Sequence, residues 1–384
     1  MDQLPSDVLH RVASLLPLAD CLRASSACKR LRAELLDGCS DPTCIHLPLG
    51  LDGWTHTKRE GFRAFLHRYP HTVASVSAAT RTPADFPYLD SLFRGLARPP
   101  RLSLLLPGGD CAAYLATSAP RQAPAFAPAV VKVYVDYLHA ASGWQELRGT
   151  WAVALGLLRC LAHFPRLEQF VLRTSLGDVQ PDGPGILPLR TPLPPSLRTL
   201  QFLVSGRSPL SVHVAQSLPP LLEKLSLNHL TPLMVTAMPV LPRLTQLCTG
   251  GRIDGVSLRL LFDKVPALRI LDFSPAGSGY NALHIAGHDA LATTVPPADL
   301  RRLAVSMPAW TTGEDAPLWD HAFEDVCLTF ESGEDIEVDT VHVSGLQRLQ
   351  CQTCTITALG VGVMLPDLSA WDRPLSLSAL VGRK

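Results

Sequence analysis

The chain has 384 residues, of which 47% are hydrophobic and 18% are charged, so it can bury a large core and does not have the composition of a disordered protein. Lysine plus arginine and aspartate plus glutamate both number 34, and no basic run occurs, which argues against nucleic acid as a partner because phosphate binding needs clustered cations. The longest apolar stretch, WAVALGLL at 151–158, is far shorter than the roughly 20 residues of a membrane-spanning helix.

Two further features concern the cellular compartment. The N-terminus lacks the cationic lead, apolar run and small-residue cleavage site of a secretory signal. The ten cysteines are scattered along the chain, as expected for reduced thiols that behave as small buried apolar groups and not for a disulfide framework. We therefore expect a cytoplasmic or nuclear protein.

The first predicted element is a group of three short helices within residues 1–40. The first helix starts near Ser6 or Asp7 and ends at Pro17, the second starts around Asp20, and the third is KRLRAELL at 29–36. Apolar residues recur at helical spacing along them. Three short helices cannot bury much apolar surface by themselves. Apolar side chains that they leave exposed would therefore mark a contact surface for a partner.

This segment resembles the F-box in its initial Leu-Pro, its apolar pairs, its Leu/Pro break and its Cys-Lys pair. The residues that carry the resemblance are Leu4, Pro5, Val8, Leu9, Val12, Leu15, Leu16, Pro17, Leu18, Leu22, Cys28, Lys29 and Leu31. The resemblance implies that all of these except Leu15 contact the Skp-family adaptor of a cullin–RING ubiquitin ligase. An alternative interpretation is a helical cap that seals the first unit of a repeat domain.

An apolar pattern, L-x-x-L-x-L, then recurs along the chain. Its clearest copy is VPALRILDF at 265–273, and the copies from Leu167 to Leu346 start 22 to 32 residues apart. Proline precedes the first apolar position by two residues in seven copies, where it ends the preceding helix and favours an extended chain. These prolines are Pro100, Pro128, Pro165, Pro195, Pro220, Pro242 and Pro266.

The repeat resembles the leucine-rich repeat, although the position that usually holds Asn or Cys varies here. The resemblance implies an α/β solenoid with parallel strands on its concave side and helices or irregular turns on its convex side. Runs such as 151–164 and 256–265 have the apolar spacing of the expected helices. We predict an F-box at 1–40, a linker or first cap at 41–65, about nine to eleven irregular repeats at 66–370, and a C-terminal tail or cap at 371–384.

Residues that alternate with the core positions of each strand are expected to face outward from the concave side. This set contains four basic residues and two acidic ones, which suits a protein partner with acidic patches. The predicted substrate-binding residues are Arg173, Gln201, Lys224, Asn228, Gln246, Asp272, Arg302 and Arg348.

Motifs for chemistry are weak. Cys351 and Cys354 form a CxxC inside a repeat without a second pair, and His284 and His288 lie four residues apart beside a Gly-rich loop that favours a solvated turn. We therefore expect no enzyme activity, no cofactor and no metal. The predicted function is a substrate-recognition subunit of an SCF (Skp–cullin–F-box) ubiquitin ligase, and the alternative is a leucine-rich-repeat interaction scaffold.

Overall fold

A computed structural model describes residues 46–50, 55–68, 73–107, 109–118, 123–136, 153–175, 192–205, 209–272, 283–286, 294–308, 322–331, 340–342, 350–359, 362–364 and 375–380. The chain divides into two compact units, Met1–Phe170 and Val171–Lys384. The predicted three-helix segment at 1–40 lies outside the described residues. Within the described part of the chain, no helix is both long and apolar enough to cross a membrane.

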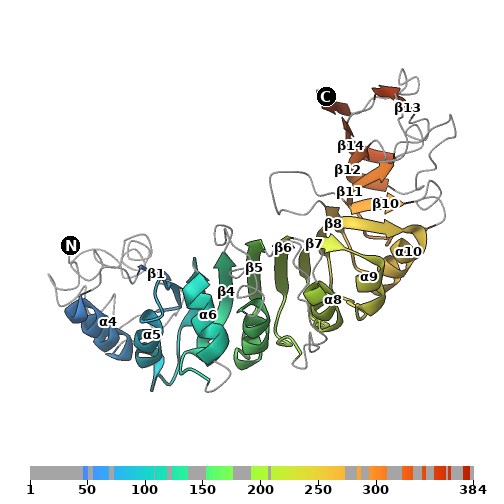
Figure 1. Ribbon diagram of the computed structural model, residues 1–384. Helices are drawn as coiled ribbons and strands as arrows, with labels where there is room; N and C mark the ends of the chain where they lie inside the picture. The colour runs from blue at the N-terminus through green and yellow to red at the C-terminus, as the bar shows by residue number, and fades with distance from the viewer. Residues whose placement is uncertain are drawn as a thin grey trace, which may run out of the picture. The chain divides into compact units, whose positions relative to one another are not determined.

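The first unit contains four parallel strands that are hydrogen-bonded to one another in chain order. A helix follows each strand, and the helices lie along one side of the strands (Figure 1). This alternation is the expected one, because parallel neighbours need a crossover that returns the chain to the same end. The strands are β1 (His46–Gly50), β2 (Ser75–Ala79), β3 (Arg101–Leu106) and β4 (Val130–Asp136), and the helices are α4 (His56–Arg68), α5 (Asp85–Phe93), α6 (Gly109–Ser118) and 153–160.

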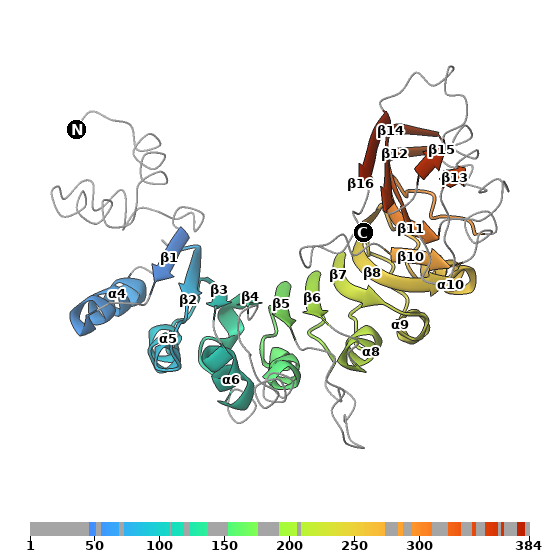
Figure 2. The same ribbon diagram turned by 45° about the horizontal axis from the view of Figure 1, so that its top comes forward.

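The second unit continues the parallel arrangement. Helices follow the first three strands that lie wholly within it, and its last three long strands run side by side (Figure 2). The strands are β6 (Thr199–Ser205), β7 (Lys224–Leu230), β8 (Gln246–Asp254), β9 (Ile270–Asp272), β10 (Leu283–Ala286), β11 (Arg302–Pro308), β12 (Ala322–Glu331), β14 (Gln350–Leu359) and β16 (Leu375–Leu380). The helices are α8 (Pro209–Gln216), α9 (Pro232–Ala237) and α10 (Gly255–Lys264).

Three strands stand apart from this series. Strand β5 (Gln169–Ser175) contains the boundary between the two units. Strands β13 (Thr340–His342) and β15 (Gly362–Met364) form a separate parallel pair.

One repeat of the second unit divides its strand into two pieces. Strand β9 pairs with the beginnings of β8 and β11, whereas β10 pairs with the end of β8 and the middle of β11. The residues between the two pieces include the Gly-rich loop noted in the sequence. His284 therefore lies on a strand, opposite Arg252 of β8 and Ser306 of β11, and not on a helix.

The predicted core positions are confirmed for the central repeats. Leu200, Leu225, Leu247 and Leu271 are direct neighbours on four successive strands, and each is fully buried. Leucines at the first position of the pattern, such as Leu222, are also fully buried. Parallel pairing in one register thus stacks equivalent leucines into a continuous core. Each repeat needs a leucine at the same position, and the sequence period follows from this requirement.

The phase of the prolines has a local cause that the sequence did not reveal. The amide of Leu197 donates to the carbonyl of Pro194 at 3.1 Å, and that of Leu222 donates to Pro219 at 3.1 Å. These bonds close tight turns in which Pro195 and Pro220 occupy the second position, where their fixed φ is favoured. Pro195 and Pro220 therefore form the turns that lead into β6 and β7, in addition to ending the preceding segments.

One prediction about the repeats needs correction. The L-x-x-L-x-L pattern, read as PPRLSLLL from Leu102, predicts that Leu105 lies in the core; Leu105 is instead 40% exposed, while Leu102, Leu104 and Leu106 are fully buried. Burial alternates along β3, so that every second residue points inward. Within the first unit β1 pairs with β2, and within the second unit β16 pairs with β14.

Candidate functional site

The predicted substrate-binding residues of the second unit are brought together on one face of the sheet. Lys224, Gln246, Ile270, Arg302 and Asp325 are neighbours across five successive strands. Because side chains alternate along a strand, a second row lies two residues farther on, on the same face. We call these two rows the sheet face; the second row is Ser226, Cys248, Asp272, Ala304 and Cys327.

The charges on the sheet face are partly paired. Nε of Arg302 lies 3.2 Å from Oδ2 of Asp272 and 3.4 Å from Oδ2 of Asp325. One guanidinium is therefore shared by two carboxylates, and the group carries a net negative charge. Because Arg302 is already paired, it does not support the expected preference for acidic partners. Lys224 is exposed and is the cation that the sheet face offers to a partner.

The second row is built from small and largely buried side chains. Cys248 is 8% exposed and accepts a hydrogen bond from Nε2 of Gln246 at 3.4 Å. Burial raises the pKa of the Cys248 thiol, and burial, together with the carboxylates of Asp325 and Asp272, raises the pKa of Cys327 to about 11. Both thiols are protonated at neutral pH, so neither supplies the thiolate that a cysteine nucleophile requires.

Asn228 differs from its prediction as an exposed contact residue. It is 6% exposed, and its side-chain amide donates to the carbonyl of Val204 on the neighbouring strand at 3.2 Å. The pairing of β7 with β8 shifts in register between Leu227 and Leu230, which interrupts simple alternation at this point. Asn228 therefore joins two repeats and is not available to a partner.

The other predicted residues fall into two groups. Arg173 on β5 and Gln201 on β6 are half-buried. Arg348 lies outside the described residues, as do all the predicted adaptor-binding residues.

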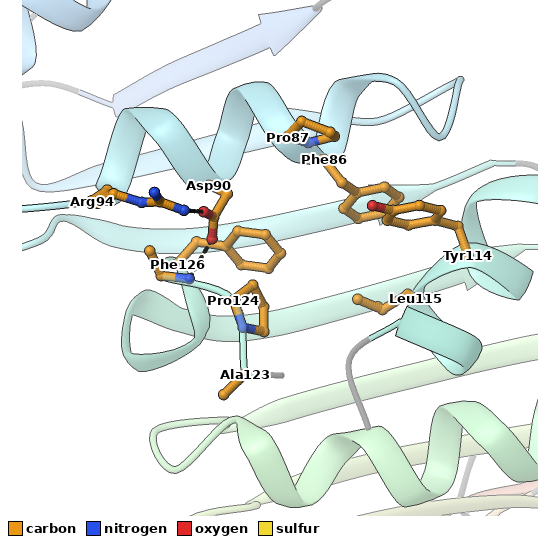
Figure 3. Close-up of a pocket in the computed structure, with 10 residues that line it drawn as sticks. Phe86, Pro87, Asp90, Arg94, Tyr114, Leu115, Ala123, Pro124 and Phe126 are labelled. Atoms are coloured by element: carbon orange, nitrogen blue, oxygen red, sulfur yellow. Dashed lines mark hydrogen bonds and ion pairs between the residues drawn. The ribbon is translucent and has the colours of Figure 1, made fainter. Parts of the chain in front are cut away.

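A second candidate site lies in the first unit, and sequence reasoning did not identify it. We call it the α5–α6 pocket; it has a volume of about 500 Å³ and is lined by α5, α6 and the segment 123–126 (Figure 3). The rings of Phe86 and Tyr114 stack with centroids 5.0 Å apart, and the ring of Phe126 lies 6.4 Å from Phe86. Its lining comes from three separate segments, and the Pro-rich stretch that includes Pro124 is typical of a turn, so no local motif marks the pocket.

The polar side of the α5–α6 pocket consists of Asp90 and Arg94. Oδ2 of Asp90 accepts a hydrogen bond from Arg94 at 2.5 Å, and its Oδ1 accepts one from the amide of Ala125. The carboxylate thus ties the segment 123–126 to α5. The side chain of Arg94 is 74% exposed, whereas that of Asp90 is 21% exposed.

The third kind of site considered is a metal centre. Within the part of the chain that the structure describes, no three His, Cys, Asp or Glu side chains are grouped so as to hold a metal ion. Cys351 and Cys354 lie on β14, and His284 lies on β10.

Comparison with known protein families concerns the N-terminal segment. Residues 1–39 match the family described as F-box-like, which confirms the prediction of an F-box for this part of the chain. In a comparison with curated proteins, no protein matched the chain. The chain therefore combines an F-box-like segment with parallel sheets and helices of an α/β solenoid-like kind.

Proposed function

We propose that this protein is a substrate-recognition subunit of an SCF-type ubiquitin ligase. The observation that carries the proposal is the F-box-like match over residues 1–39. In the proposed complex this segment docks on a Skp-family adaptor, which links it to a cullin–RING ligase. The rest of the chain holds the target protein.

We further propose that the repeats are of the leucine-rich type. Support comes from the L-x-x-L-x-L pattern, whose equivalent leucines stack in register, and from the turn that recurs before several strands, including β6 and β7. Repeats that contact only their neighbours create an extended surface, which suits recognition of another protein. The sheet face is our candidate for the contact with the target.

The proposed role is one of positioning and not of catalysis. A receptor that binds both adaptor and target raises the concentration of the target beside a ubiquitin-loaded enzyme. This role requires no nucleophile, cofactor or metal of its own. A ligase of this kind would act in the cytoplasm or the nucleus.

The first test is capture of the Skp-family adaptor by the full chain. We predict that the double variant Leu4→Ala with Pro5→Ala abolishes co-purification, because both substitutions remove apolar surface from the proposed docking segment. The matched control is His10→Ala with Arg11→Ala, a double alanine variant in the same segment but outside the apolar pattern. The control should retain capture.

Capture of the adaptor by the Leu4/Pro5 variant at wild-type strength would refute the docking assignment. The alternative, that residues 1–40 only cap the repeats, predicts no adaptor capture by the wild type and a lower melting temperature when the segment is deleted. Affinity purification with and without residues 1–40, followed by mass spectrometry, separates adaptor-dependent partners from those of the repeats.

A further inference from the structure

We propose that the α5–α6 pocket binds a small aromatic carboxylic acid. The pocket lies within the first unit and uses none of the residues of the sheet face or of the F-box-like segment. The inference is therefore independent of the role in ubiquitination.

The apolar lining of the pocket favours an aromatic ligand. Three aromatic rings, Phe86, Tyr114 and Phe126, form much of the wall, together with Pro87, Leu115 and Pro124 (Figure 3). The volume of about 500 Å³ falls within the range typical of small-molecule sites. Stacked and edge-on ring contacts favour a flat aromatic group over a flexible aliphatic chain.

The polar side of the pocket, Asp90 and Arg94, favours a ligand with a negative charge. Arg94 has five N–H donors in a planar fork, and its hydrogen bond to Asp90 uses one end of that fork. Its exposed guanidinium can therefore pair with a second carboxylate through two parallel hydrogen bonds. A cationic ligand is disfavoured, because Asp90 already accepts from Arg94 and from the amide of Ala125.

The hydroxyl of Tyr114 adds a second polar contact at the other end of the pocket. Figure 3 shows the Tyr114 ring beside Phe86, with its hydroxyl directed away from α6. Among the described residues it has no hydrogen-bond partner in the protein. The pocket thus offers apolar walls between a cation and a hydroxyl, which matches an aromatic acid with a further polar substituent.

The test measures binding of 3-(2-naphthyl)propionate to the full chain by titration calorimetry, with 3-(2-naphthyl)propan-1-ol as the uncharged counterpart. We expect saturable binding of one acid per chain, with the alcohol at least tenfold weaker. Arg94→Gln should weaken binding of the acid at least tenfold and leave binding of the alcohol within about twofold, because only the acid uses the guanidinium. The matched control is Arg98→Gln, an exposed arginine that does not line the pocket, and it should bind the acid like the wild type.

Three results would overturn the proposal: no saturable binding of the acid by the wild type, equal affinity for acid and alcohol, or equal affinity of the Arg94 and Arg98 variants for the acid. Thermal unfolding of each variant checks that it is folded. Should Arg94→Gln fail to fold, Ala123→Trp provides the second variant, because a large side chain at this exposed lining position fills the pocket. It should abolish binding of both compounds, and unchanged binding would again overturn the assignment.

Discussion

At the scale of single residues, Asp254 illustrates how a repeat starts its helix. It is the N-cap of α10, and its Oδ1 accepts a hydrogen bond from the amide of Ser257 at 2.8 Å. This bond satisfies one of the amides that a helix leaves unpaired at its start. The same bond is the main reason why the pKa of Asp254 lies below its ordinary value of 3.8.

We predict that Asp254→Ala lowers the free energy of unfolding by about 1 kcal/mol at pH 7. A carboxyl whose pKa is depressed by folding stabilises the folded state above its ordinary pKa, and this contribution is lost as the pH falls through the lower folded pKa. The difference between wild type and Asp254→Ala should therefore shrink below about pH 4. Chemical denaturation at several pH values measures it.

The control for this prediction is Asp254→Asn, which keeps a capping oxygen without a charge. It should retain most of the stability at pH 7, and its advantage over Asp254→Ala should not change with pH. A difference between wild type and Asp254→Ala that is the same at pH 3 and pH 7 would contradict the role assigned to the ionised cap.

Gly251 is a second residue whose identity is required by geometry. Its φ is +106°, and a Cβ at this position would lie 2.6 Å from the amide nitrogen of Leu230 and would overlap the Leu230 carbonyl oxygen. The residue lies where the pairing of β7 and β8 resumes after the register shift. Only glycine combines this backbone conformation with so close an approach.

We predict that Gly251→Ala lowers the free energy of unfolding by at least about 2 kcal/mol, since it adds backbone strain and an overlap with a rigid neighbour. Gly61→Ala is the matched control, because Gly61 lies within α4 and a Cβ there meets no atom within 4 Å. The control should be neutral or slightly more stable. A loss at Gly251 no larger than that at Gly61 would show that the strand relaxes around the added methyl group.

At the scale of elements, Lys264 joins two consecutive helices. It is the last residue of α10, and its Nζ donates to the carbonyls of Val235 at 2.9 Å, Thr236 at 2.7 Å and Met238 at 2.5 Å. These carbonyls lie at the C-terminal end of α9, where a helix lacks internal donors. The side chain of Lys264 thus caps the C-terminal end of α9, the helix of the preceding repeat.

We predict that Lys264→Met lowers the free energy of unfolding by about 1–3 kcal/mol and speeds amide hydrogen exchange in α9, because three carbonyls lose a charged donor. Lys224→Met, which removes a lysine from the exposed row of the sheet face, is the control and should leave exchange in α9 unchanged. Equal exchange in α9 for both variants would contradict the capping role. Hydrogen exchange with mass spectrometry resolves the peptide that contains α9.

At the scale of the whole molecule, the proposed receptor separates adaptor docking from target capture. We predict that Lys224→Glu weakens target capture by the repeats without loss of the adaptor, because it reverses the exposed cation of the sheet face. Arg302 is unsuitable for this test, since its reversal would place three carboxylates together.

The control for target capture is Arg243→Glu, a charge reversal at an exposed position that precedes β8 and lies outside the sheet face. Quantitative pull-down of target and adaptor from the same preparation measures both functions at once. Equal target capture by the two variants would contradict the assignment of the sheet face as the contact with the target.

Local sequence patterns predict correctly which side chains face the core only where the strand keeps a regular alternation. Leu200, Leu225 and Leu247 were assigned to the core correctly, because an inward leucine at a fixed position of each repeat needs no knowledge of its partners. The same reasoning placed Leu105 inward and Asn228 outward, and both were wrong. A single register shift or a different phase in one strand reverses which side chain faces the core, and such shifts leave no mark in the local sequence.

The sequence by itself determined the repeat period and most of the core of the central repeats, because both follow from local spacing of apolar residues and prolines; the F-box-like segment and the parallel strands were expected from resemblance to known families. Only the tertiary structure decided that Arg302 is shared by Asp272 and Asp325, that Asn228 bonds to the neighbouring strand, and that α5, α6 and the segment 123–126 enclose a pocket. These features join residues about 20 to 40 positions apart, whose distances depend on register and crossover length. A local pattern carries no information about such distances.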